Sequence, residues 1–137
     1  MTWSVEGKTV VVVGAGRSGV AAADLLVSHG ARVTLADQRV DRPVAADRLE
    51  AAGIVLALGP HAPELFATAD LIVVSPGVPP TEPAISAARA NAVPVIGEVE
   101  LASRWMTGRI IAITGTKGKS TTTTLTAGTV WQFPLTG

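Results

Sequence analysis

Short apolar runs alternate with longer stretches of helical spacing along most of this chain. β-Branched runs that end at glycine, aspartate or serine are typical of strands buried in a parallel sheet. Alanine- and leucine-rich stretches closed by glycine or asparagine are typical of helices. The pattern predicts strands at residues 9–13, 32–36, 54–58, 70–74 and 94–96. It predicts helices at residues 20–28, 44–52, 83–91 and 98–105.

The alternation of strands and helices predicts an α/β fold, a Rossmann-like, doubly wound parallel sheet with right-handed crossovers. The pair Thr107-Gly108 follows the last of these helices and marks a joint in the chain. We therefore expect a first domain at residues 1–107, and the first strand, loop and helix start of a second domain at residues 108–137. Ligands of doubly wound sheets bind outside the carboxyl ends of the strands, where the motifs of this chain lie.

The first motif is a glycine-rich loop, Gly14-Ala15-Gly16-Arg17-Ser18-Gly19, between the first predicted strand and the first helix. With Asp37 at the end of the second strand, it matches the dinucleotide-binding fingerprint and indicates a nucleotide or nucleotide-sugar site. Asp37 could accept hydrogen bonds from a ribose or a base, and Arg39 could face a phosphate or a base carbonyl. The alternative is that the glycines serve close packing and that Asp37 is a turn or cap residue.

The fourth predicted strand ends at Ser75-Pro76-Gly77. Proline and glycine fix a sharp turn, which leaves the Ser75 hydroxyl and the Gly77 N–H free to meet a ligand. Taken alone, the motif favours a plain turn.

A second glycine loop, residues 115–121, follows the apolar run at residues 110–114 and precedes a predicted helix start. Its glycines let the backbone wrap an anion, and a helix N-terminus adds about half a positive charge. Lys119 would reach the terminal phosphates of a nucleotide, and the hydroxyl of Ser120 or Thr121 would ligate Mg²⁺. The alternative is a serine- and threonine-rich helix start unrelated to phosphate.

Composition excludes several classes of protein. The formal net charge is zero, which gives no global basic field for nucleic acid or an anionic membrane. Cysteine is absent, so disulfides and thiolate metal sites are excluded. No apolar stretch is long enough to span a membrane, and the N-terminus lacks the pattern of a signal peptide. We expect a soluble, cytoplasmic protein without nucleic acid or membrane partners.

The second loop has Ile113 where the usual eight-residue phosphate loop has glycine. Its shorter G-T-x-G-K-S-T form resembles the loop of the Mur ligases and folylpolyglutamate synthetases. The upstream motifs, together with the run Ile96-Gly97-Glu98-Val99-Glu100-Leu101, resemble the Mur ligases in order and spacing from about Glu6 to Thr126. The resemblance implies an ATP-dependent ligase of peptidoglycan synthesis that joins D-glutamate to UDP-N-acetylmuramoyl-L-alanine through an acyl phosphate.

The resemblance also implies which residues bind the UDP part of the substrate. Arg17 and Ser18 would lie along the nucleotide, although Arg17 departs from the small or apolar residues frequent there in the family. Asp37 and Arg39 would lie near the uracil, and the Ser75 turn near the diphosphate. The implied residues are Gly14, Arg17, Ser18, Asp37, Arg39, Ser75, Pro76 and Gly77.

For ATP, the resemblance implies Gly115, Thr116, Lys117, Gly118, Lys119, Ser120 and Thr121. Lys119 would contact the β and γ phosphates and is the implied catalytic residue, and Ser120 would ligate Mg²⁺. Glu98 and Glu100 are interpreted as structural or hinge residues at the close of the first domain.

The sequence after Glu100 contains no Asp, Glu or His. Phosphoryl-transfer sites need Asp or Glu side chains to hold Mg²⁺ beside the loop hydroxyl. The tail at residues 131–137 also departs from the family, because Pro134 would stop the helix expected there. We therefore expect a truncated or frame-shifted N-terminal portion that binds the UDP-muramoyl substrate weakly and has no ligase activity.

Two other functions remain open. The chain could be a non-catalytic UDP-sugar-binding module, which fits the missing acids. It could be an NAD-dependent oxidoreductase, which rests on the first loop and Asp37 and leaves Gly115 to Thr121 unexplained.

Overall fold

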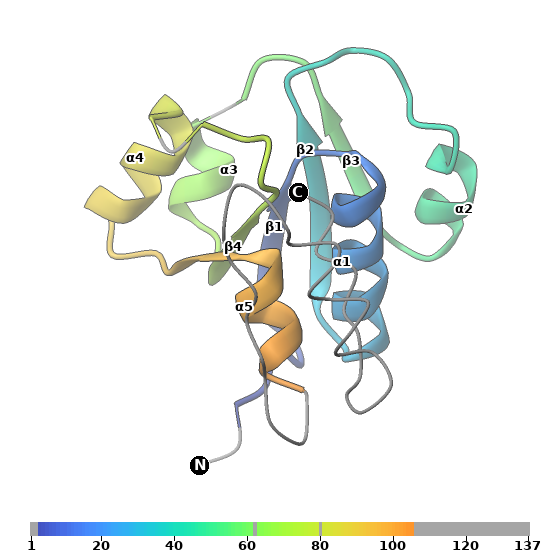
Figure 1. Ribbon diagram of the computed structural model, residues 1–137, viewed down its shortest axis with the longest axis horizontal. Coiled ribbons are helices and arrows are strands. Elements are labelled where there is room, and N and C mark those ends of the chain that lie inside the picture. Colours follow the sequence, from blue (N-terminus) through green and yellow to red (C-terminus); the bar gives the residue numbers. More distant parts are fainter. Residues whose placement is uncertain (1–2, 62, 80, 106–137) are drawn as a thin grey trace, which may run out of the picture. The chain divides into compact units, whose positions relative to one another are not determined.

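A computed structural model describes residues 3–61, 63–79 and 81–105 of the chain. Five strands in this part form one parallel sheet in the order β3-β2-β1-β4-β5 (Figure 1). The strands are β1 (Thr9–Val13), β2 (Arg32–Asp37), β3 (Val55–Leu58), β4 (Leu71–Val74) and β5 (Val95–Gly97). The helices are α1 (Arg17–Ser28), α2 (Ala46–Ala51), α3 (Pro63–Ala67), α4 (Pro83–Ala90) and α5 (Glu98–Ser103).

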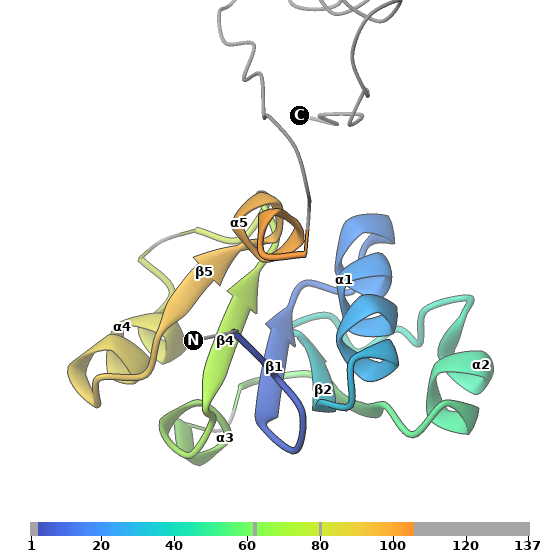
Figure 2. The same ribbon diagram turned by 90° about the horizontal axis from the view of Figure 1, so that it is seen from below.

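The central strand, β1, separates two hydrophobic cores because its side chains alternate between the faces of the sheet. Val10 and Val12 belong to one core, with Leu26 of α1 and Leu101 of α5. Val11 and Val13 point to the opposite face and belong to the other core, with Phe66 of α3 and Ala84 of α4. Helices α1, α2 and α5 therefore cover one face, and α3 and α4 cover the other (Figure 2).

The order of the strands places a topological switch at β1. From β1 the chain runs outward through β2 to β3, then returns to the other side of β1 as β4 and continues to β5. Successive connections on the two sides of β1 therefore lead away from each other. The crevice at the carboxyl ends of such a switch is the usual ligand site of a doubly wound sheet. The predicted α/β fold with a doubly wound parallel sheet is confirmed for the described residues.

Most element bounds differ from the sequence prediction by one or two residues. The largest shift is at α1, which begins at Arg17 rather than at residue 20, because Gly16 is already the N-cap. Helix α3 was not predicted. Its five residues contain one buried apolar side chain, Phe66, which is too few to reveal a helical period.

The predicted second domain and its phosphate loop lie outside the described residues. No helix in the described part is both long and apolar enough to cross a membrane.

Candidate functional site

The motifs after β1, β2 and β4 meet at the carboxyl edge of the sheet. The Gly14 N–H donates to the carbonyl oxygen of Ala36 at 2.7 Å, which fixes the glycine loop beside the end of β2. On the other side, the Ser75 N–H donates to the carbonyl oxygen of Val13 at 3.0 Å. Three segments that are far apart in the sequence therefore start side by side, as the parallel sheet requires.

Gly14 and Gly19 allow close contact between the glycine loop, α1 and Ser75. Gly14 has φ of 106°, a left-handed conformation that glycine adopts readily. A Cβ on Gly19 would lie 1.7 Å from the carbonyl oxygen of Gly14, and a Cβ on Gly14 would lie 2.8 Å from the Ser75 hydroxyl oxygen. Close packing is therefore one role of these glycines. Gly16 differs, since a Cβ there would meet no atom within 4 Å.

The N-terminus of α1 is open to a ligand. Arg17 and Ser18 lie in its first turn with exposed side chains, and the N-cap Gly16 makes no side-chain capping bond. No acidic residue occupies that first turn. The first N–H groups of a helix and its dipole favour an anion, and the positive charge of Arg17 adds to this preference.

Asp37 connects the glycine loop to Arg39. Its Oδ2 accepts from the Ala15 N–H at 2.9 Å and from Nη2 of Arg39 at 2.9 Å. Its Oδ1 accepts from the Arg39 N–H at 2.8 Å and from Nε of Arg39 at 3.2 Å. The Arg39 guanidinium, helped by the N–H groups of Ala15 and Arg39, holds the pKa of the Asp37 carboxyl well below its usual range despite partial burial. Asp37 is therefore ionised at any physiological pH.

These four bonds occupy the acceptor capacity of the Asp37 carboxylate, which offers about four lone-pair sites. A ribose hydroxyl or base N–H would have to displace one of them. The Asp37 side chain is 12% exposed, whereas that of Arg39 is 69% exposed. Arg39 is thus the partner that can face a ligand, and Asp37 fixes its orientation.

The Ser75 turn is linked to α5. The Ser75 hydroxyl donates to Oε1 of Glu98, the first residue of α5, at 2.5 Å. The hydroxyl is therefore engaged, in contrast to the free group expected from the sequence. Sequence reasoning gave Glu98 a structural or hinge role but missed this bond, since a separation of 23 residues leaves no local signal.

The rest of the turn is as open as its sequence indicates. The Val78 N–H donates to the Ser75 carbonyl oxygen at 3.0 Å, which closes the turn. Pro76 and Gly77 are exposed, and a Cβ on Gly77 would meet nothing within 4 Å. A ligand can therefore approach the backbone of Gly77 closely.

The predicted ATP loop lies outside the described residues, and its roles stay predictions. Among residues 3–61, 63–79 and 81–105, no group of three or more His, Asp or Glu side chains could hold a metal ion. The loop residues concerned are Gly115, Thr116, Lys117, Gly118, Lys119, Ser120 and Thr121.

The sequence matches known proteins over most of its length. Residues 8–97 match a family described as "Mur ligase MurD-like, N-terminal domain". A relative from Myxococcus xanthus is 50% identical over 129 residues, covering 92% of this chain and 28% of its own length. One from Koribacter versatilis is 46% identical over 127 residues, covering 88% of this chain and 27% of its own length. Both are named UDP-N-acetylmuramoylalanine--D-glutamate ligase, and this chain spans about a quarter of their length.

Two solved structures with a similar fold are named as ligases. A pseudomurein peptide ligase type C from Methanothermus fervidus gives a TM-score of 0.64 at 31% identity, over 85% of this chain and 24% of that one. The UDP-N-acetylmuramate-alanine ligase MurC from Thermotoga maritima gives a TM-score of 0.60 at 27% identity, over 88% of this chain and 28% of that one.

Proposed function

The chain belongs to the Mur ligase family, in which its residues 8–97 match the MurD-like N-terminal domain, and from this premise we propose that it binds UDP-N-acetylmuramoyl-L-alanine. The binding site is the carboxyl edge of the sheet. Two features of this edge support the proposal most. Arg39 is exposed and is held in place by Asp37, and its guanidinium suits a planar base. The N-terminus of α1 has no side-chain cap and suits a diphosphate.

Each part of the edge has a role in this proposal. The diphosphate lies at the N-terminus of α1, against the loop from Gly14 to Ser18, with Arg17 adding charge. Arg39 faces the uracil, and Asp37 keeps its guanidinium in place. The Ser75-Pro76-Gly77 turn bounds the diphosphate end, where the exposed Gly77 backbone allows a close approach.

The complete reaction is a proposal that rests on the family. A ligase of this type transfers the γ-phosphoryl group of ATP to the L-alanyl carboxylate, and the amine of D-glutamate then displaces phosphate to form the amide. Lys119 on the β and γ phosphates and Mg²⁺ at Ser120 would offset repulsion between the two anions. A carbon–nitrogen ligase of peptidoglycan synthesis, with ATP and a UDP-sugar as substrates, would work in the cytoplasm.

The 137 residues alone should bind substrate without turning it over. Their sequence offers no Asp, Glu or His after Glu100 to hold Mg²⁺ or to move a proton beside the second glycine loop. Within this chain, the edge of the sheet then acts as a UDP-sugar-binding module.

A nicotinamide dinucleotide fits the edge less well. The fingerprint for such cofactors uses the acid at the end of the second strand to bind a ribose hydroxyl. Asp37 already accepts from Ala15 and from Arg39. An incoming hydroxyl would have to break one of these bonds.

Isothermal titration of the 137-residue chain tests the proposal. We expect UDP to bind with a dissociation constant of about 10 μM to 1 mM, and NAD not to bind in that range. Arg39→Ala should weaken UDP binding about tenfold, since it removes a charged hydrogen-bond donor. Arg42→Ala is the matched control, because Arg42 is also exposed and pairs with carboxylates on α2. Binding of NAD in preference to UDP, or equal losses in the two variants, would contradict the assignment.

A further inference from the structure

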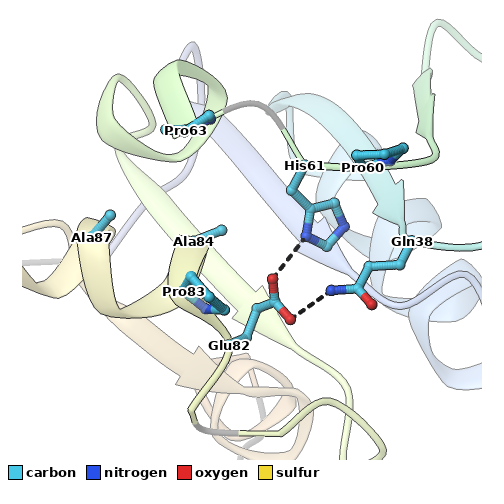
Figure 3. Close-up of a pocket in the computed structure, with 8 residues that line it drawn as sticks. All are labelled: Gln38, Pro60, His61, Pro63, Glu82, Pro83, Ala84 and Ala87. Carbon is cyan, nitrogen blue, oxygen red and sulfur yellow. Dashed lines mark hydrogen bonds and ion pairs between the residues drawn. The ribbon is translucent and has the colours of Figure 1, made fainter.

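A pocket of about 480 Å³ opens on the face covered by α3 and α4, near the ends of β2 and β3 (Figure 3). The lining residues are Gln38, Pro60, His61, Pro63, Glu82, Pro83, Ala84 and Ala87. None of them is a residue assigned to the proposed UDP site, although Gln38 lies between Asp37 and Arg39 in the sequence. Its volume lies in the range of small-molecule sites, of about 300–1,000 Å³.

His61 contributes a buried ring whose nitrogens make no hydrogen bond, although one of them lies near Glu82. Its side chain is 5% exposed, and neither ring nitrogen makes a hydrogen bond to any residue in the described part of the chain. The ring lies 5.2 Å from that of Phe66, centroid to centroid, and Nδ1 lies 3.5 Å from Oε1 of Glu82. A buried polar atom without a hydrogen bond is unfavourable, and a ligand that bonds to it would recover that cost.

Glu82 supplies negative charge to the same pocket. Its side chain is 13% exposed, and its Oε2 accepts from Nε2 of Gln38 at 2.6 Å. Figure 3 shows the His61 ring and the Gln38 amide both directed toward this carboxylate. Each carboxylate oxygen has a second lone pair, so Glu82 can still accept hydrogen bonds from a ligand.

The remaining surface supplies few donors. Three of the eight lining residues are prolines, which have no backbone N–H, and two are alanines. An anionic ligand would therefore meet the Glu82 charge with few N–H groups to compensate. A ligand that donates N–H groups and carries positive charge would suit Glu82, and a flat apolar part would suit the prolines.

We propose that this pocket binds a small planar cation of the amidinium or guanidinium class. Its N–H groups donate to Glu82 and to Nε2 of His61, the ring nitrogen that does not face Glu82, and its plane packs against the prolines. The site is separate from the UDP edge, because Asp37 and Gln38 are neighbours whose side chains bond in different directions. Asp37 accepts from Ala15 of the glycine loop, whereas Gln38 donates to Glu82 in the loop before α4.

Proton NMR of the 137-residue chain with benzamidine as the probe tests this site. The sequence has two histidines, so the ring protons of His61 report the pocket and those of the exposed His29 serve as an internal control. We expect saturable shifts of the His61 signals alone, with a dissociation constant of about 1 mM for so small a ligand. Benzoate has the same ring and the opposite charge, and it should shift neither histidine. Equal effects of benzamidine and benzoate on His61, or no effect of benzamidine up to about 20 mM, would overturn the proposal.

Two variants and a competition locate the charge that selects the cation. Glu82→Gln should weaken benzamidine binding about tenfold, as expected when a charged hydrogen bond becomes neutral. Glu64→Gln, an exposed change on α3 outside the pocket lining, should leave affinity within about twofold. Benzamidine affinity should be the same with and without saturating UDP. Unchanged affinity in Glu82→Gln, or displacement by UDP, would contradict a separate cation site.

Discussion

Asp37 acts on the candidate site through the groups that it holds rather than through a free carboxylate. Its four hydrogen bonds join the glycine loop at Ala15 to the backbone and guanidinium of Arg39. The sequence correctly placed Asp37 and Arg39 at the carboxyl edge of the sheet. It could not show that they pair with each other, because a pattern of residue types does not give side-chain directions.

Replacing Asp37 by Asn should lower the stability of the protein and its affinity for UDP. Asn keeps the size of the side chain and an oxygen for Ala15, but it loses the charged pair with Arg39. We expect a loss of about 1–2 kcal/mol in the free energy of unfolding and about tenfold weaker binding of UDP. Urea unfolding and titration calorimetry measure the two effects. Unchanged UDP affinity in a folded Asp37→Asn protein would contradict the positioning role.

The lowered pKa of Asp37 should make the free energy of unfolding depend on pH. The pKa of Asp37 is lower in the folded than in the unfolded chain, so its ionised form stabilises the fold above about pH 4. That contribution decreases as the pH falls from about 4 toward the folded-state pKa. Between pH 6 and pH 3 the parent protein should lose more unfolding free energy than Asp37→Asn, measured by urea unfolding. Equal losses in the two proteins would show that the Asp37 pKa is not lowered by folding.

At the scale of elements, the turn from β1 into α1 depends on contact between backbone atoms. A Cβ on Gly19 would collide with the carbonyl oxygen of Gly14, whereas a Cβ on Gly16 would meet nothing within 4 Å. One glycine of the fingerprint is therefore required for packing and another leaves space at the helix N-terminus. The packing interpretation drawn from the sequence thus holds for Gly19, whereas ligand approach, for which Gly16 leaves space, stays a prediction.

Alanine at the two positions should separate these roles. Gly19→Ala should cost more than about 3 kcal/mol of unfolding free energy, since backbone atoms have little freedom to move aside. Gly16→Ala should cost less than about 1 kcal/mol, as for a change from glycine to alanine at an N-cap. Thermal or urea unfolding of both variants provides the comparison. Similar stability of the two variants would mean that α1 does not pack on Gly14 as described.

The sequence predicted the elements better than their contacts. Strands such as β1 were predictable because β-branched runs bounded by glycine have few other uses. Helix α3 was missed because Phe66 is its single buried side chain, and one buried residue shows no helical period. The His61–Glu82 pair was missed because 21 residues separate the partners, and only the fold brings α4 beside the end of β3.

At the scale of the whole described part, the first and last segments contact each other. The ring of Trp3 lies 5.0 Å from that of Trp105 in an edge-to-face arrangement, and His29 stacks on Trp105 at 4.0 Å. The guanidinium of Arg104 lies 5.4 Å from the centre of the Trp3 ring. Aromatic pairs of this kind contribute about 0.5–1.5 kcal/mol beyond their burial. These contacts link the segment before β1 with the end of α5.

A polypeptide of residues 1–107 should therefore fold and bind UDP by itself. The sheet and both hydrophobic cores lie within this range. We expect a single cooperative thermal transition and a UDP affinity within about threefold of that of the 137-residue chain. Circular dichroism and titration calorimetry measure these quantities. A polypeptide that stays unfolded would place the domain boundary elsewhere.

UDP should bind at the carboxyl edge of β1, β2 and β4. Amide NMR of the 137-residue chain titrated with UDP tests it most directly, because each backbone N–H of the edge reports separately. We expect saturable shifts at Gly14 to Ser18, at Arg39 and at Gly77, with no shift of the His61 ring signals. Shifts confined to other residues, or no shifts at millimolar UDP, would contradict it.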